Sequence, residues 1–277
     1  MGNAVMERGL KQAEAELHET DAGWAAPAAA TASGALQPET VSDWTPAPPA
    51  GRLRTMTMGG VASATGVLLV VLLAAGVVGW NLVTEPEPGQ LRFPGWLFVP
   101  LLAAVGVAFL TVFRPELARL TGPVYAILEG LVLGAISRVY EEQWNGIVLQ
   151  AVAITVFVLG AMAFLYATRI IKVTDRMRRI VVGAMLGLFV FYGISLLLSL
   201  FSVSVPLIWD SGPFGILFSV AVCGLAAFNL ALDFDLAERG VQAGLPKQME
   251  WFCGFALMVS LVWLYLEVLR LLGKLRS

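Results

Sequence analysis

Long uncharged stretches alternate with short charged ones along most of this chain. After Arg54, five stretches of 21 to 30 residues carry no charge, and two further apolar stretches each hold a single acid. A helix needs about 20 apolar residues to cross the hydrocarbon core of a bilayer, and in lipid it satisfies its own backbone groups. The pattern therefore predicts seven transmembrane helices, at residues 59–83, 93–113, 121–140, 145–168, 180–203, 212–234 and 250–272.

Composition agrees with this pattern. Of the 277 residues, 58% are hydrophobic and 14% are charged, whereas soluble domains carry about 25% charged residues. We therefore expect an all-α integral membrane protein, a seven-transmembrane-helix bundle whose main partner is the lipid bilayer. A net charge of −2 gives no electrostatic footprint for nucleic acid.

The first 54 residues differ from the rest of the chain. They mix acidic and basic residues with a stretch rich in Ala, Pro, Ser and Thr at positions 25–50. Such a segment cannot bury enough apolar surface to offset the entropy of ordering it. We expect residues 1–54 to form a disordered tail and residues 55–277 to form the transmembrane domain.

The charges between the predicted helices set the orientation. Eleven basic residues lie before the first helix and in the second, fourth and sixth loops, against two in the first, third and fifth loops. Because basic loops stay in the cytoplasm, the N-terminus and the arginine-rich loop 169–179 are predicted to be cytoplasmic. Seven full crossings would then place Arg270, Lys274 and Arg276 outside. Either these side chains reach the far interface, or one helix crosses only halfway.

Enzyme chemistry has little support in the sequence. The single histidine, His18, lies in the tail, and Cys223 and Cys253 both lie inside apolar runs. No membrane-embedded base, zinc set or nucleophile motif follows from these residues. We therefore expect no catalytic residues and no cofactor, and the sequence does not identify a metal site.

Acids inside a membrane are functional candidates because burying a charge in lipid is costly. Glu129 lies deep in the third helix, so it must face the bundle interior, either paired or protonated. Glu267 lies one turn before Arg270, at the spacing of a helical ion pair. Asp233 and Asp235 close the sixth helix on different faces, and we expect Asp235 to be the more exposed of the two.

Two pairs of glycines have the spacing that lets transmembrane helices approach closely. Gly130 and Gly134 lie in the third predicted helix, and Gly183 and Gly187 lie in the fifth. Both pairs predict tight helix packing, and neither belongs to a nucleotide-binding loop.

Three segments give the chain a resemblance to a known family. Residues 125–137 (YAILEGLVLGAIS) resemble the third-helix signature of the Bax inhibitor-1-like family, in a bacterial, actinobacterial-type branch. Residues 232–236 (LDFDL) fall where that family has an acid after its sixth helix, and residues 263–273 are similar to its closing helix. The resemblance covers roughly residues 52–277 and leaves out the tail.

The resemblance implies a seven-helix fold with the last helix at its centre. It further implies a pH-sensitive calcium leak, in which acids from helices six and seven share a proton and form a cytoplasmic latch with an arginine. Asp233 matches the helix-six acid, and Arg114 is the best match to the arginine. Ser260 stands at the position of the helix-seven acid, so the second acid is missing, and Glu129 or Glu267 could substitute for it.

The sequence therefore predicts a bacterial inner-membrane protein that permits slow, proton-regulated passage of cations. Calcium is the expected ion because carboxylate oxygens suit a hard cation. The alternative is a non-transporting regulator that binds a membrane quality-control protease, with the tail as a contact. An intramembrane enzyme is a third class, disfavoured by the lack of catalytic groups.

Overall fold

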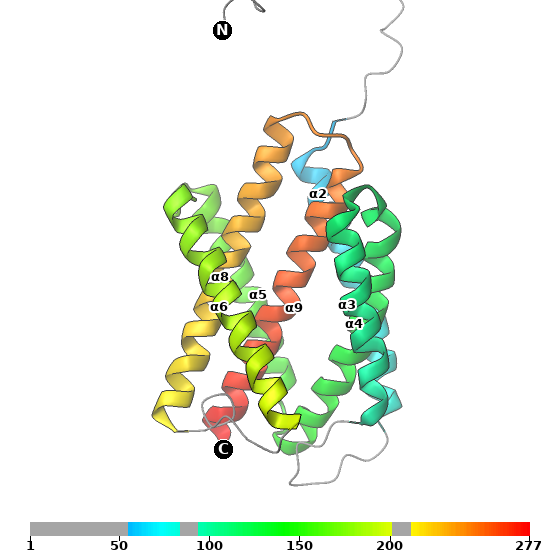
Figure 1. The fold of residues 1–277 in the computed structure, drawn as a ribbon, viewed down its shortest axis with the longest axis vertical. Helices are drawn as coiled ribbons and strands as arrows, with labels where there is room; N and C mark the ends of the chain where they lie inside the picture. The colour runs from blue at the N-terminus through cyan, green and yellow to red at the C-terminus, as the bar shows by residue number, and fades with distance from the viewer. Residues whose placement is uncertain (1–54, 84–93, 201–211) are drawn as a thin grey trace, which may run out of the picture. The chain divides into compact units, whose positions relative to one another are not determined.

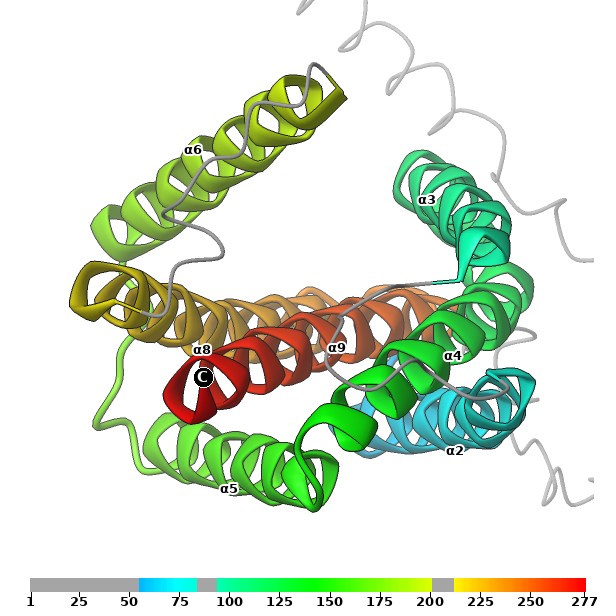
Figure 2. The same ribbon diagram turned by 90° about the horizontal axis from the view of Figure 1, so that it is seen from below.

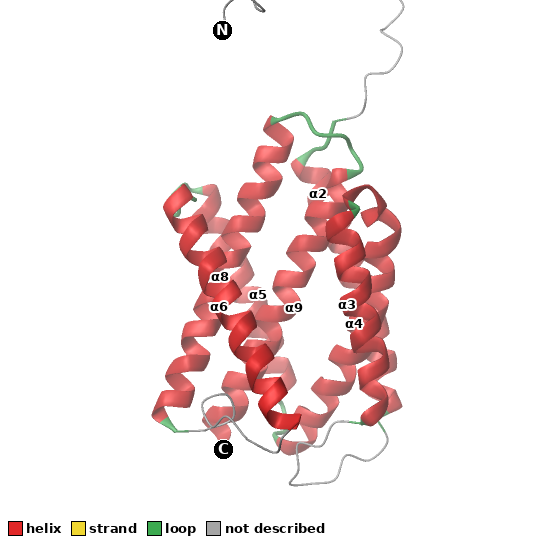
Figure 3. Cartoon of the chain, viewed as in Figure 1, coloured by secondary structure: helices red, strands yellow, loops and turns green. Residues whose placement is uncertain are grey.

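The structure, a computed structural model, describes residues 55–83, 94–200 and 212–277. The tail predicted at residues 1–54 lies outside the described residues. Within them the fold is all α, as Figure 3 shows. Seven helices of the described part are long and apolar enough to cross a membrane. They are α2 (Met58–Leu82), α3 (Phe98–Phe113), α4 (Ala118–Gln143), α5 (Ile147–Ala167), α6 (Asp175–Leu200), α8 (Pro213–Gln242) and α9 (Met249–Arg276). The predicted seven-helix membrane bundle is confirmed.

Two short 3-10 turns, Gly95–Leu97 and Pro115–Leu117, lead into α3 and α4. The Thr57 hydroxyl caps α2 by accepting a hydrogen bond from the Gly60 amide at 3.0 Å. Helices α4 and α9 run a few residues beyond their predicted spans, and α6 and α8 run further, since α6 begins at Asp175 and α8 continues to Gln242. The difference has a physical reason, because apolar runs mark the part of a helix that meets lipid, whereas charged residues can extend the same helix beyond it.

The helices run up and down between two ends of the bundle (Figure 1). We call the end at which α2 begins the N-side; Arg114, Arg169 and Leu245 also lie there. We call the end at which α9 finishes the C-side. On the N-side, the amide of Met56 donates to the Leu245 carbonyl at 2.9 Å, which ties the start of α2 to the turn between α8 and α9.

The last helix is central. Helix α9 packs against α2, α4, α5 and α8, and seen along the bundle it lies among the others (Figure 2). In contrast, α3 packs chiefly on α4, and α6 packs on α8. Both are therefore peripheral, and α6 has few neighbours to hold it in place.

The C-terminal helix runs the whole length of the bundle. The Lys274 ammonium donates to the Gly215 carbonyl, at the start of α8, at 3.0 Å. The Arg276 guanidinium donates to the Asn145 carbonyl at 3.1 Å and to Gln150 Oε1 at 2.8 Å, beside the start of α5. Helix α9 is long and apolar enough to cross a membrane, and Lys274 and Arg276 bind polar groups at the C-side, whereas Arg270 pairs with Glu267.

The glycines of α4 lie against α2. A Cβ at Gly134 would overlap the Gly76 backbone, and a Cβ at Gly130 would overlap the Leu72 carbonyl. This pair confirms the prediction of tight packing. The prediction is wrong for Gly183 and Gly187, where an added Cβ would meet no atom within 4 Å. These two glycines lie on α6, a peripheral helix, and no neighbour from the described part of the chain reaches them.

Candidate functional site

Asp233 lies on α8 where that helix packs along α9. The Ser260 hydroxyl, on α9, donates a hydrogen bond to Asp233 Oδ2. The Asn229 amide, one turn earlier on α8, donates to the Ser260 hydroxyl at 2.7 Å and approaches Asp233 Oδ2 at 3.5 Å. We call these three residues the Asp233 cluster. Its single ionisable group is held by two neutral partners, and in the described part of the chain it forms no ion pair.

The Asp233 cluster brings together two of the residues singled out in the sequence. Ser260, the position of the missing second acid, contacts the acid that it was expected to face. Asn229 was not anticipated. Its signal was available, because it is a polar residue four positions before Asp233 in an apolar run, and residues at this spacing share a helix face.

Arg114 does not join the Asp233 cluster. It is exposed at the end of α3, and it makes no ion pair with Asp233 in the part of the chain described by the structure. The carboxylate of Asp233 is instead hydrogen-bonded to α9, while α3 packs chiefly on α4. The expected contact between Arg114 and Asp233 is therefore not formed in this conformation.

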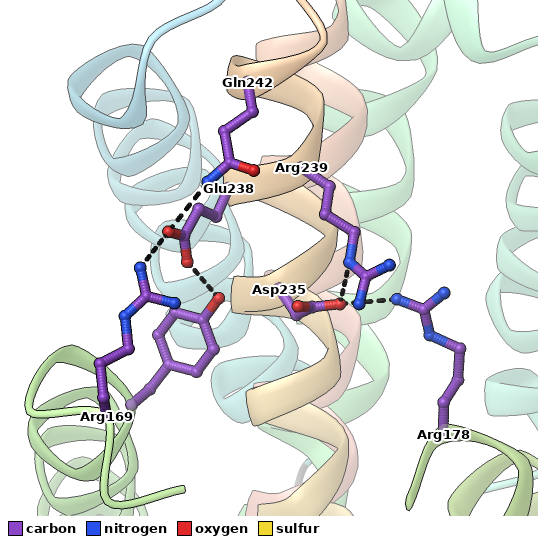
Figure 4. Close-up of polar contacts among 7 residues, drawn as sticks. Arg169, Arg178, Asp235, Glu238, Arg239 and Gln242 are labelled. Carbon is purple, nitrogen blue, oxygen red and sulfur yellow. Dashed lines mark hydrogen bonds and ion pairs between the residues drawn. The ribbon is translucent and has the colours of Figure 1, made fainter. Parts of the chain in front are cut away.

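The expectation for Asp235 was wrong. We expected it to be more exposed than Asp233, but it is buried, with 8% of its surface exposed. Its Oδ2 atom pairs with Arg178 Nη2 at 2.6 Å and with Arg239 Nε at 2.7 Å (Figure 4). Two residues along a helix turn the side chain by about 200°, so Asp235 leaves the face of Asp233 and meets the start of α6.

A second ion pair holds the turn between α5 and α6 to α8. Glu238 accepts hydrogen bonds from the Arg169 guanidinium and from the Tyr166 hydroxyl, and Gln242 donates to it at 3.2 Å (Figure 4). Together with the Asp235 pairs, these contacts tie α6 to α8 on the N-side. The arginine-rich loop was noticed in the sequence only for its effect on orientation.

Glu129 is buried in α4, as its depth in the span predicted, with 8% of its surface exposed. Its carboxyl group lies beside Tyr125, one turn earlier on the same helix. Among the described residues it forms no ion pair. Glu129 and the Asp233 cluster lie on different helices, and no hydrogen bond links them in the described residues.

We expect Glu129→Gln to be tolerated far better than Glu129→Lys. The Gln variant keeps the size and the hydrogen-bonding capacity without a buried charge, whereas a lysine near the centre of a transmembrane helix costs about 2.5–3.5 kcal/mol on insertion scales. Thermal unfolding in detergent would measure the difference. The control is Glu142, at the exposed end of α4, where Gln and Lys should differ little because its exposed ion pair with Arg138 contributes little to stability. Equal stability of the two Glu129 variants would contradict a buried role.

Glu267 forms the predicted pair within α9. Its carboxylate is 2% exposed and accepts from Arg270 Nη1 at 3.0 Å. Tyr192 of α6 closes the group: its hydroxyl accepts from Arg270 at 2.7 Å and donates to Glu267 at 3.2 Å. Hydrogen bonds of Tyr192 thus link α6 to α9 at this point, and the charge of Glu267 is already compensated, unlike that of Asp233.

No cluster of three metal-ligating side chains (His, Cys, Asp or Glu) that could hold a metal ion occurs among the described residues. The Asp233 cluster offers one carboxylate, one hydroxyl and one amide oxygen.

Comparison with known families gives one match. A family model described as Bax inhibitor 1 like covers residues 3–277. The match includes the N-terminal segment that the three sequence signatures left out. No curated protein and no solved structure matches this chain.

Proposed function

This chain belongs to the Bax inhibitor 1 like family, and we propose that it permits slow, proton-regulated passage of cations across a bacterial inner membrane. One observation carries the proposal. Asp233 is a half-buried acid on α8 beside α9, held by the neutral side chains of Ser260 and Asn229, with no ion pair in the described residues. An ionisable group placed in this way changes the net charge of its surroundings when it takes up a proton.

Protonation of Asp233 would act on the contact between α8 and α9. The ionised carboxylate accepts the Ser260 hydrogen bond, and it also attracts a passing cation. The neutral acid attracts cations weakly and can itself donate a hydrogen bond. Two hydrogen-bonding states of one contact give a two-state element that a proton can bias. Calcium is the ion we propose, since carboxylate and amide oxygens are its preferred ligands.

The latch needs an arginine as well as an acid. In this conformation the arginine that joins two helices beside Asp233 is Arg178, which ties α6 to Asp235 of α8. Arg114, expected from the family resemblance, would reach Asp233 only in a second conformation. We propose that one arginine contact is released when Asp233 takes up a proton. Variants of Arg178 and Arg114 identify which of the two arginines takes part.

Calcium flux into proteoliposomes, measured with an enclosed dye between pH 6 and pH 8, tests this function. We expect wild-type flux above that of protein-free vesicles, with a rate that depends on pH. Arg178→Ala should change the pH response if the α6 contact is the latch, and Arg114→Ala should do so if the second conformation forms. Arg119→Ala, an exposed arginine at the start of α4, is the matched control.

Absence of flux from the wild type would overturn the transport proposal. It would favour the alternative, a membrane regulator that binds a quality-control protease without transporting ions. A pull-down of membrane proteases with and without residues 1–50 would then test whether the N-terminal segment makes that contact.

We also propose that the N-side faces the cytoplasm, because the basic loops gather there and such loops stay inside. A cysteine replacing Asp175, at the start of α6, should resist an impermeant thiol reagent applied to intact cells. A cysteine replacing Asn145, between α4 and α5 on the C-side, should react. Both are compared with wild type, whose Cys223 and Cys253 give the background. Labelling at position 175 but not at 145 would reverse the topology.

A further inference from the structure

A hollow of about 740 Å³ lies between α6, α8 and α9. Its walls are mainly apolar, including Val182, Leu186, Phe189, Leu232, Leu236 and Trp263. This volume falls in the range of about 300–1,000 Å³ that is usual for ligand pockets. Because α6 packs on α8 and is otherwise peripheral, the hollow follows the flank of the bundle, where a membrane-spanning protein meets lipid.

The rim of the hollow on the N-side is charged. Arg178 of α6 and Arg239 of α8 both line it, and both pair with the one carboxylate of Asp235. At the rim two cations therefore face the single carboxylate of Asp235. Asn229 and Asp233 of the Asp233 cluster also line the hollow, where the Ser260 hydroxyl donates to the Asp233 carboxylate. In Figure 4 both guanidinium groups reach Asp235, that of Arg239 from the same helix α8 and that of Arg178 from α6.

These arginines have hydrogen-bonding capacity to spare. A guanidinium carries five N–H donors, and in the described part of the chain each of the two uses a single nitrogen toward Asp235. Their side chains are 41% and 49% exposed, against 12% for Asp235. A phosphate at the rim could therefore take up the free donors without displacing Asp235, in the geometry that arginine favours.

From these observations we propose that the hollow is a binding site for an anionic phospholipid. One acyl chain lies along the apolar walls formed by α6, α8 and α9, and the headgroup phosphate binds Arg178 and Arg239. Polybasic sites at a membrane surface attract anionic lipids with about 1 kcal/mol per basic residue, or roughly fivefold in affinity. A zwitterionic lipid has the same acyl chain but lacks the net charge, so it should bind more weakly.

Trp263 makes the proposal testable because it lines the hollow. The full chain is reconstituted in phosphatidylcholine with increasing amounts of phosphatidylglycerol brominated on its acyl chains. Bromine quenches tryptophan only at close range. The emission lost on going from wild type to Trp263→Phe isolates the signal of this residue. A parallel series uses brominated phosphatidylcholine, and neither series measures ion flux, so the result is independent of the proposed transport.

We expect brominated phosphatidylglycerol to quench Trp263 at a mole fraction at least fivefold lower than brominated phosphatidylcholine. Arg178→Gln with Arg239→Gln should bring the two lipids to equal quenching. Asp235→Asn breaks the same ion pairs but keeps both cations, so it should retain or increase the preference. It therefore separates loss of headgroup binding from loosening of α6. Arg119→Gln, a cation on the same side but away from the hollow, should change nothing.

Three results would overturn the proposal. Equal quenching of Trp263 by both lipids in the wild type would show ordinary surrounding lipid with no headgroup recognition. An unchanged preference in the double arginine variant would place the anion elsewhere. Loss of the preference in Asp235→Asn as well as in the double variant would show that the packing of α6, rather than the cations, creates it.

Discussion

Replacing Asp233 by Asn should abolish the pH response of calcium flux. Asparagine resembles the protonated acid in size and neutrality, and it cannot be ionised. Since the ionised carboxylate attracts the cation, wild-type flux should be lower at pH 6 than at pH 8, and the ratio of flux at pH 6 to flux at pH 8 should rise to about one in the variant. The measurement is the proteoliposome assay over the same pH range for both proteins, with the amount of reconstituted protein matched.

Two further variants sharpen this result. Asp175→Asn removes an exposed acid at the start of α6 and should leave the pH response intact. Ser260→Asp would place a second carboxylate against Asp233, and two acids at this distance hold one proton between them. The midpoint of the pH response should then move by about one unit or more. A wild-type pH response in Asp233→Asn would remove Asp233 from the mechanism.

The largest structural effect is expected for Gly134→Leu. A side chain at this position would collide with the backbone of Gly76, where α4 meets α2. Overpacking costs typically 1–3 kcal/mol, and a clash with backbone, which cannot rotate aside, lies at or above the top of that range. We expect a marked fall in the unfolding temperature in detergent and a smaller yield of monodisperse protein.

Gly187→Leu is the matched control. It makes the same chemical change in a transmembrane helix, with the same gain in helix propensity, at a position where an added Cβ would meet no atom within 4 Å. Its unfolding temperature should stay close to that of wild type or rise slightly. Similar losses for both variants would mean that the close contact between α2 and α4 is not what makes Gly134 necessary.

The positions of the seven helices could be predicted from the sequence because the requirement is local. Each stretch of the chain must be apolar for about 20 residues to cross the hydrocarbon, whichever helix lies beside it. The same reasoning placed Glu129 inside the bundle and Glu267 beside Arg270, since depth and helical spacing depend only on the helix that carries them.

Which helices pack against each other could not be predicted from the sequence in this way. Gly130 with Gly134 and Gly183 with Gly187 show the same spacing, but only the first pair lies against another helix. Nothing local separates them, because a glycine is tightly packed only if a second helix, elsewhere in the chain, comes close. The prediction is correct for Gly130 and Gly134 because α2 packs against them. It is wrong for Gly183 and Gly187 because α6 lies at the periphery of the bundle.

For the candidate site, too, the sequence predicted some residues, whereas only the tertiary structure showed how the charged residues are paired. The sequence identified Asp233 as an acid to consider, and the family resemblance gave Ser260 as the position facing it. Only the tertiary structure showed that Asp235 is buried between Arg178 and Arg239, and that Arg114 is not bonded to Asp233 in this conformation. The physical reason is that hydrophobic patterning fixes which side chains leave water, whereas the pairing of buried charges depends on the packing between helices, which is a property of the whole bundle.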